Sequence, residues 1–135
     1  MSNYRRWVVP GGTYFFTLVA YRRRPILTTE LGRDSLRQAI DSIRARWPFE
    51  NVAMVLLPEH LHAVWSLPPN DDNYSLRLRK IKERFTRLWL ANGGAEAALS
   101  ASRQHKGERG IWQRRFWEHS CRDEEDVKRC VDYIH

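Results

Sequence analysis

The 135-residue chain is 42% hydrophobic and 29% charged, a composition typical of an ordinary soluble globular domain. Its 23 Lys and Arg residues against 16 Asp and Glu give a formal net charge of +7, mostly from arginine, which favours a nucleic-acid partner over a small acidic substrate. Two cysteines are too few for a disulfide framework. No apolar run reaches membrane-spanning length, and the N-terminus lacks the apolar region of a signal peptide. We therefore expect one cytoplasmic domain over residues 1–135 with no membrane partner.

The first predicted strand runs from Thr13 to Tyr21, after Gly11-Gly12. Aromatic and β-branched residues on both of its faces are typical of a central strand. A basic loop follows, and then a helix that Thr28 or Thr29 can cap. The apolar residues of this helix have the spacing of one buried face: Leu36, Ala39, Ile40, Ile43 and Trp47.

Two further strands are predicted at Val52–Leu57 and His60–Leu67, with a tight turn at Pro58-Glu59 between them. The next helix is expected to begin after Ser75 as N-cap and to end at Asn92-Gly93-Gly94. Its apolar residues are expected to face inward: Leu78, Ile81, Phe85, Leu88 and Trp89. Its basic residues are expected to lie largely outside: Arg77, Lys80, Lys82, Arg84 and Arg87.

The last elements are a strand around Phe116–Cys121 and a helix capped by Asp123. The helix carries one apolar stripe: Val127, Cys130, Val131 and Ile134. The order βαββαβ plus a terminal helix predicts an α+β ferredoxin-like sandwich, with an antiparallel sheet and helices on one face. The other face is expected to be free.

His60 and His62 are the most informative residues of the chain. Alternate side chains of a strand point to one face, so the two imidazoles project side by side while Leu61 points the other way. Such a pair is awkward in an apolar core and natural as half of a divalent-metal site. By itself the pair is more often structural than ligating, so the residues alone leave both interpretations open.

Tyr133 supplies a candidate nucleophile. It lies on the flank of the last predicted helix, about 110° from the centre of the apolar stripe. Arg129, one turn earlier, falls on nearly the same side and could hold a phosphate. A tyrosine beside a metal and an arginine is suited to attack phosphorus. Tyr133 taken alone is more often a packing residue.

Four sequence blocks together resemble a known family. His60-Leu61-His62 after Val55–Glu59 is similar to the HUH motif of single-tyrosine transposases. The remaining blocks resemble the REP-associated tyrosine transposases (RAYTs): residues 11–17, 111–119 and 131–135. The resemblance covers essentially the whole chain in the right order.

The resemblance implies a function and its site residues. His60 and His62 match the metal-binding pair, which uses Mg²⁺ or Mn²⁺, and Tyr133 matches the nucleophile that forms a 5′-phosphotyrosine link with single-stranded DNA. The implied substrates are hairpins from repetitive extragenic palindromes (REPs). The family motif continues to an Asn four residues past the tyrosine, which completes the metal site. Because this chain stops at His135, we expect the domain to lack that C-terminal tail, and the activity of this form stays open.

Nine basic residues are candidates for contact with DNA: Arg5, Arg6, Arg22, Arg23, Arg24, Lys82, Arg114, Arg115 and Arg129. Arg114 and Arg115 interleave with aromatic residues, as groove-lining segments often do. His119 is a candidate third metal ligand, although an ordinary hydrogen-bonded histidine is the simpler interpretation. Glu59 is interpreted as a turn residue.

Our leading hypothesis is a metal-dependent endonuclease and strand transferase for hairpin DNA. The alternative is a non-catalytic hairpin DNA- or RNA-binding module, in which exposed aromatics such as Tyr14 and Phe16 would stack on bases. A metallohydrolase acting on a small molecule ranks last, since the further His and Asp motifs of such sites are missing. A homodimer stays open, because some single-tyrosine relatives place the tyrosine helix of one subunit in the site of another.

Overall fold

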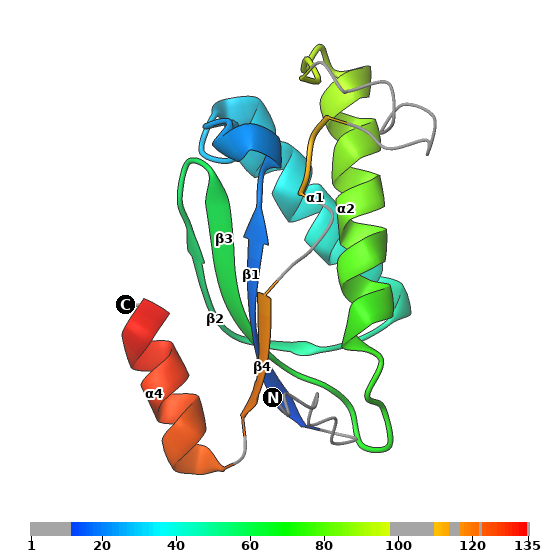
Figure 1. Ribbon diagram of the computed structural model, residues 1–135. Coiled ribbons are helices and arrows are strands. Elements are labelled where there is room, and N and C mark those ends of the chain that lie inside the picture. Colours follow the sequence, from blue (N-terminus) through cyan, green and yellow to red (C-terminus); the bar gives the residue numbers. More distant parts are fainter. Residues whose placement is uncertain (1–11, 98–109, 114–116, 122, 135) are drawn as a thin grey trace.

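The computed structural model describes residues 12–97, 110–113, 117–121 and 123–134 (Figure 1). Its centre is a four-stranded sheet in the order β2-β3-β1-β4. The strands are β1 (Thr13–Val19), β2 (Glu50–Leu56), β3 (His60–Ser66) and β4 (Trp117–Cys121). Every neighbouring pair is antiparallel, and this order is that of the ferredoxin-like sandwich. The predicted fold class is confirmed.

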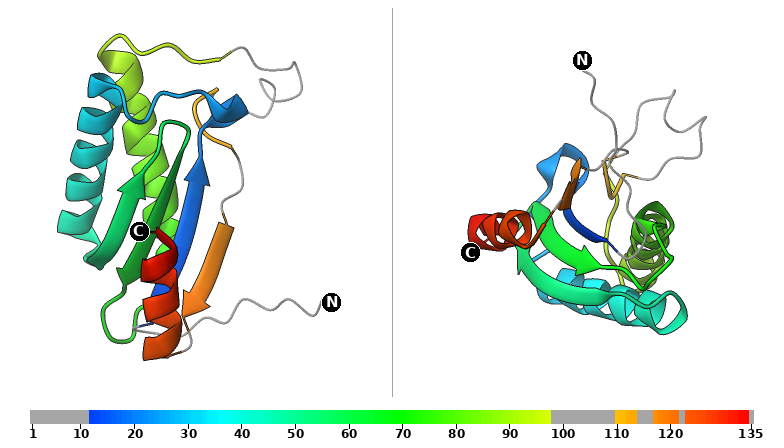
Figure 2. Two further views of the ribbon diagram at one scale, coloured as in Figure 1. Left: turned by 90° about the vertical axis from the view of Figure 1, so that its left-hand side faces the viewer. Right: turned by 90° about the horizontal axis from the view of Figure 1, so that it is seen from below.

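The helices form layers on both faces of the sheet (Figure 2). Helices α1 (Glu30–Arg46) and α2 (Tyr74–Ala91) cover one face, as expected. Helix α4 (Glu124–Ile134) packs against the opposite face, where Ile134 joins Ala53 and Val64 in a small apolar cluster. The expectation that this face is free is therefore wrong, because the apolar stripe of α4 has to be buried against something.

The alternation of side chains along β1 and β3 divides the core between the two faces. Tyr14 and Phe16 on β1, with Leu61 and Trp65 on β3, point toward α1 and α2 and are at most 2% exposed. The residues between them point toward α4, among them Phe15. His60 and His62 lie on this second face as well, as the sequence predicts.

Each of the helices α1, α2 and α4 begins after a short polar residue that caps it, and one of these caps differs from the prediction. The Thr29 Oγ1 accepts a hydrogen bond from the Gly32 backbone at 3.0 Å, and the Asp123 carboxylate accepts one from the Asp126 backbone at 2.8 Å, so both predicted caps are confirmed. Helix α2 instead begins one residue before Ser75, because Asn73 Oδ1 accepts from the Leu76 backbone at 3.2 Å. Ser75 is thus a first-turn residue and not the cap.

Arg77 is only 1% exposed. The expectation that it lies on the outer face of α2 is therefore wrong. Its guanidinium donates to both carboxylate oxygens of Asp71, at 3.1 and 2.7 Å. It also donates to the backbone carbonyls of Trp47, Asn73 and Pro48. A charge can be buried when all its donors are paired, and this arginine ties the end of α1 to the start of α2.

A short 3₁₀ helix, Tyr21–Arg23, follows β1 where the sequence predicts more strand and a loop. Arg22 and Arg23 both have left-handed backbones, with φ of 54° and 52°, and both side chains are exposed. The backbone N–H of Ala20, just before the turn, donates to the Glu59 carbonyl at 2.9 Å. The turn therefore lies beside the residue that precedes His60. No helix in the described part of the chain has the length and apolar content that crossing a membrane requires.

Candidate active site

The two histidines lie side by side on β3, and a neighbouring group holds one nitrogen of each ring. The ring centroids of His60 and His62 are 4.7 Å apart. The Nδ1 of His60 lies 3.0 Å from the Glu59 carboxylate, and the Nδ1 of His62 lies 2.8 Å from the Thr17 hydroxyl. In both rings this leaves Nε2 without a hydrogen-bond partner among the described residues. A partner on Nδ1 fixes the tautomer and orientation of an imidazole whose Nε2 can bind a ligand.

The surroundings of His62 favour its neutral ring. Burial lowers the pKa of His62 below its ordinary value of 6.5, and the nearby His60 lowers this pKa further. A neutral imidazole is the form that coordinates metals. The pair thus has the side-by-side geometry of half a metal site, and His62 is favoured in the neutral form that ligates.

Helix α4 brings Tyr133 to this pair. The Tyr133 ring is 72% exposed, and its centroid lies 5.7 Å from that of His62. Phe15 on β1 contacts both rings: it stacks on His62 at 5.6 Å and meets Tyr133 edge-on at 5.8 Å. Three rings from three separate elements therefore form one cluster, and the phenol is left accessible at its edge.

The position of α4 depends on its buried side. Ile134, next to Tyr133, is 7% exposed and packs with Ala53 and Val64, while Cys130 and Val131 pack around them. Arg129 is on the outer side, 61% exposed, with its guanidinium 3.7 Å from the Asp126 carboxylate. The stripe that was predicted from spacing is thus the surface by which α4 docks.

The candidate DNA-binding residues within the described ranges divide into two groups. Arg22 and Arg23 have exposed side chains, at the end of the sheet where β3 begins with His60. Arg24 and Lys82 hold parts of the fold together: Arg24 donates to the Ala95 and Gly110 carbonyls, and the half-buried Lys82 donates to the Gln113 carbonyl at 2.9 Å. Burial also lowers the pKa of Lys82. Apart from these and Arg129, four candidates lie outside the described residues: Arg5, Arg6, Arg114 and Arg115.

Two further residues belong to the site, and sequence reasoning missed both. Thr17 holds His62, and Phe15 supports His62 and Tyr133. Both are on β1, whose register sets Thr17 directly opposite His62. The alternation of β1 could have placed Phe15 and Thr17 on one face, but only the strand pairing shows what faces them.

His119 and Glu59 have clear partners. His119 Nε2 donates a hydrogen bond to the Asp126 carboxylate at 2.9 Å, and its role as a third ligand beside His60 and His62 stays a prediction. Glu59 stands in the turn, as expected, and also holds His60. The aromatics that the RNA-binding alternative requires on the surface are buried: Tyr14 is 0% and Phe16 1% exposed, because both face α1 and α2. That use of them is excluded.

Comparison with known proteins identifies the family of the chain. Residues 8–135 match the family model described as "Transposase IS200 like". The chain belongs to this transposase family. It is 42% identical over its whole length to the REP-associated tyrosine transposase of Escherichia coli K12, covering 71% of that protein. It is also 42% identical to a Haemophilus influenzae protein provisionally given the same name, covering 74% of it.

Solved structures give the same result. The chain superposes with a TM-score of 0.74 on a REP-associated tyrosine transposase bound to a REP hairpin, at 41% identity over 99% of this chain and 70% of that one. A second match is a Deinococcus radiodurans R1 crystal structure that is provisionally described as a transposase. It gives a TM-score of 0.58 over 99% of this chain and 95% of that one. Because its sequence identity is 18%, this match supports the fold alone. The predicted family resemblance is confirmed.

Proposed function

We propose that this transposase cleaves and transfers single-stranded hairpin DNA, with Tyr133 as the nucleophile and His60 and His62 as ligands of a divalent metal. The observation that carries the proposal is the proximity of Tyr133 to the histidine pair within one chain, with ring centroids 5.7 Å apart. An exposed phenol lies next to two imidazoles whose Nε2 atoms have no hydrogen-bond partner among the described residues, so a nucleophile and two candidate ligand atoms share one face of the sheet.

The chemical step follows from the chain's own groups. The Tyr133 oxygen attacks phosphorus, a bond forms between them, and the bond from phosphorus to the 3′ oxygen of the leaving strand breaks. The phenol gives up its proton and the leaving oxygen gains one. The product is a 5′-phosphotyrosine, which a 3′ hydroxyl can attack in the reverse sense to rejoin DNA. Arg129, exposed one turn before Tyr133, would pair with the phosphate charge.

His60 and His62 fit a Mg²⁺ or Mn²⁺ ion through their Nε2 atoms. Glu59 and Thr17 would keep these rings in the ligating orientation. When bound, the ion supplies polarisation of a phosphodiester oxygen and stabilises charge that develops on it. Imidazole nitrogen has a higher affinity for Mn²⁺ than for Mg²⁺, so we expect the pair to bind Mn²⁺ more tightly.

The DNA partner is inferred from the relatives. One solved relative is bound to a REP hairpin, and two relatives at 42% identity carry REP in their names. The exposed Arg22 and Arg23 beside the start of β3 offer phosphate contacts next to the proposed cleavage centre. We therefore infer a palindromic single-stranded DNA as substrate, processed in the bacterial cytoplasm.

A labelled REP-type hairpin incubated with Mn²⁺ and separated on a denaturing gel tests the proposal. We expect a protein–DNA adduct that requires the metal and disappears in Tyr133→Phe, while binding measured by gel shift stays within about threefold. Tyr74→Phe is the control, because it removes a phenolic hydroxyl from a buried residue on the α1 and α2 side of the sheet. Hairpin binding by wild-type protein without any adduct would instead support a non-catalytic binding module.

The arrangement within one chain also predicts action in cis. Mixing Tyr133→Phe with a His60→Ala, His62→Ala double variant should not restore the adduct. Restored adduct formation in the mixture would show that a dimer exchanges its tyrosine helices.

A further inference from the structure

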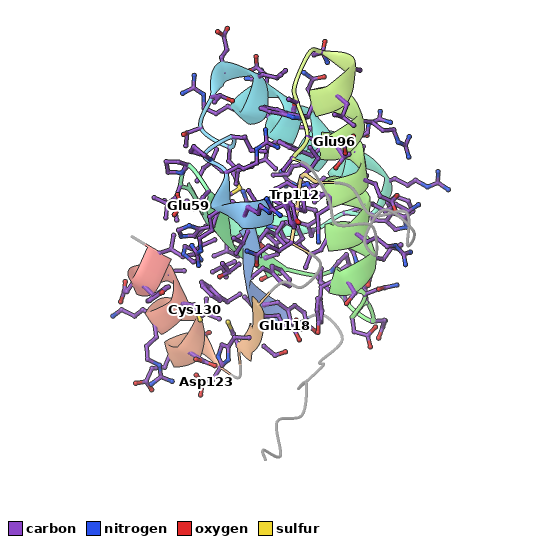
Figure 3. All side chains as sticks on the ribbon, turned by 45° about the horizontal axis from the view of Figure 1, so that its top comes forward. Glu59, Glu96, Trp112, Glu118, Asp123 and Cys130 are labelled. Carbon is purple, nitrogen blue, oxygen red and sulfur yellow. The ribbon has the colours of Figure 1, made fainter. Side chains whose placement is uncertain are left out.

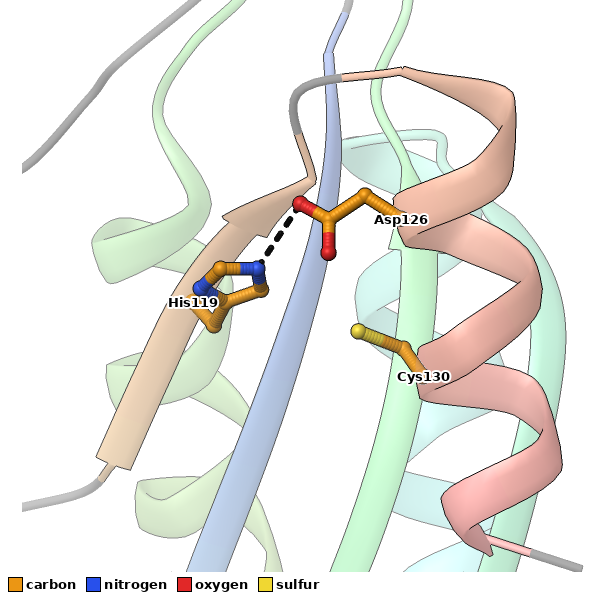
Figure 4. Close-up of side chains that lie close together, drawn as sticks. All are labelled: His119, Asp126 and Cys130. Atoms are coloured by element: carbon orange, nitrogen blue, oxygen red, sulfur yellow. Dashed lines mark hydrogen bonds and ion pairs between the residues drawn. The ribbon is translucent and has the colours of Figure 1, made fainter.

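A second cluster of metal-ligating side chains lies where β4 turns into α4. His119 on β4 and Asp126 and Cys130 on α4 point toward one another (Figure 4). One ligand atom from each lies within 4.8 Å of the others. The Sγ of Cys121, at the end of β4, is 3.7 Å from the Sγ of Cys130. Nitrogen, oxygen and two sulfur donors thus come together at one corner of the fold.

The distance between the two sulfur atoms is close to that of a tetrahedral zinc site. Zinc bound to two thiolates at about 2.3 Å places the sulfurs roughly 3.8 Å apart, close to the 3.7 Å between Cys121 and Cys130. Zinc bound to imidazole and carboxylate sets their ligand atoms about 3.4 Å apart. His119 Nε2 and Asp126 Oδ2 are 2.9 Å apart, so a small opening of this hydrogen bond admits the ion. Cys121, whose Sγ lies 3.7 Å from that of Cys130, would supply the fourth donor.

The burial of the corner also favours a cation. Asp126 is only 5% exposed. Its ion-pair partners include His119 at 2.9 Å and Arg129 at 3.7 Å. His119 is 46% exposed at its side chain, which leaves a route for an ion from solvent.

We propose that His119, Asp126, Cys130 and Cys121 form a Zn²⁺ site that fastens α4 to β4. Thiolate and imidazole donors select zinc over Mg²⁺, and four protein ligands leave no open position, so this is a structural site. Binding would release the two thiol protons, and the neutral His119 ring would ligate through Nε2 with its proton on Nδ1, so sulfur is not oxidised.

This site is separate from the histidine pair of the proposed active site. β4 pairs with β1 and β1 with β3, so His119 is two strands, about 10 Å, from the strand that carries His60 and His62. In Figure 3 Cys130 and Asp123 lie together at the α4 side, while Glu59 lies further along the sheet. The zinc proposal therefore stands or falls independently of the proposed cleavage chemistry. Because Tyr133 lies three residues after Cys130 on α4, an ion at this site would also hold in place the helix that carries Tyr133.

Cobalt and zinc are the probes for this test. Reduced protein freed of metal by a chelator is titrated with Co²⁺, and a thiolate-to-cobalt charge-transfer band should appear with one equivalent and vanish when Zn²⁺ is added. Cys130→Ser should lose the band, and the His60→Ala, His62→Ala double variant should keep it. Zinc should also raise the Tm of wild type and of the double variant, but not that of Cys130→Ser.

His119→Gln provides a second variant if Cys130→Ser does not fold, because its side chain is half exposed and the change is mild. We expect at least a tenfold loss of cobalt affinity in it. No charge-transfer band in folded, reduced wild type would overturn the proposal, as would a band that survives in Cys130→Ser or disappears with the His60 and His62 changes. A Cys121–Cys130 disulfide that forms in air despite bound zinc would also contradict it.

Discussion

The rings of His62 and Tyr133 lie with their centroids 5.7 Å apart, although one is on a central strand and the other on the last helix. Phe15 touches both and joins the two halves of the cluster. The contact depends on α4 being docked through Ile134 on the same sheet face as the histidines. The metal ligands and the nucleophile proposed here are thus brought together by the packing of α4, and changes in that packing should alter activity without touching either group.

Thr17→Val should impair DNA processing more than folding. The variant keeps the shape of the side chain but removes the hydroxyl that holds Nδ1 of His62 at 2.8 Å. Loss of such a partner lowers metal affinity or activity by about 10- to 100-fold. Adduct formation titrated with Mn²⁺ measures this. Thr13→Val is the control, because its hydroxyl bonds Ser66 on the same two strands, away from the pair. Equal effects of both changes would contradict a role for Thr17 at the site.

Arg22 and Arg23 should contribute to DNA affinity through phosphate contacts. Changing each to Gln removes one exposed charge and should reduce the slope of log K against log salt concentration by about 1 per residue. Arg24→Gln is expected to lower thermal stability instead, since Arg24 donates to the Ala95 and Gly110 carbonyls. Fluorescence anisotropy with a labelled hairpin over a range of salt concentrations separates the two behaviours. An unchanged slope in Arg22→Gln, Arg23→Gln would place the DNA elsewhere.

The lowered pKa of His62 predicts a loss of stability in mild acid. The folded pKa lies below the unfolded value of about 6.5, so the unfolded chain binds more protons between the two values. The contribution is fully present above pH 6.5 and is lost as pH falls through the folded pKa. Urea unfolding in EDTA should show a steeper loss for wild type than for His62→Gln over that range. Parallel pH profiles for the two proteins would count against the shift.

Arg77→Met should destabilise the fold strongly. The change leaves the Trp47, Asn73 and Pro48 carbonyls and the Asp71 carboxylate without their buried donor. Breaking a buried, fully bonded charge pair costs about 3–5 kcal/mol, and the lower end applies here because Asp71 is 33% exposed at its side chain. Arg79→Met, an exposed position on the same helix, should change the free energy of unfolding by no more than about 0.5 kcal/mol. Chemical denaturation of both variants measures the difference.

The periodicity of the sequence predicts most of the fold, because local rules decide it. The alternation of β1 and β3, the stripes of three helices and the caps Thr29 and Asp123 all follow from spacing and short-range hydrogen bonding. These local rules do not predict the burial of Arg77. Its position on the helix looks solvent-facing, and only the loop carbonyls and Asp71, which approach from other elements, make its burial favourable.

The sequence by itself determined the sheet face of His60 and His62, the helical flank of Tyr133 and the family to which the blocks belong. It could not place α4 on the histidine face, nor show that Thr17 and Phe15 support the pair. Nor could it show that Cys121 and Cys130 meet beside His119 and Asp126. These relationships join residues far apart in the chain, and they depend on strand register and on which face a helix buries. Local patterns fix where a side chain points along its own element, whereas tertiary packing decides what it meets.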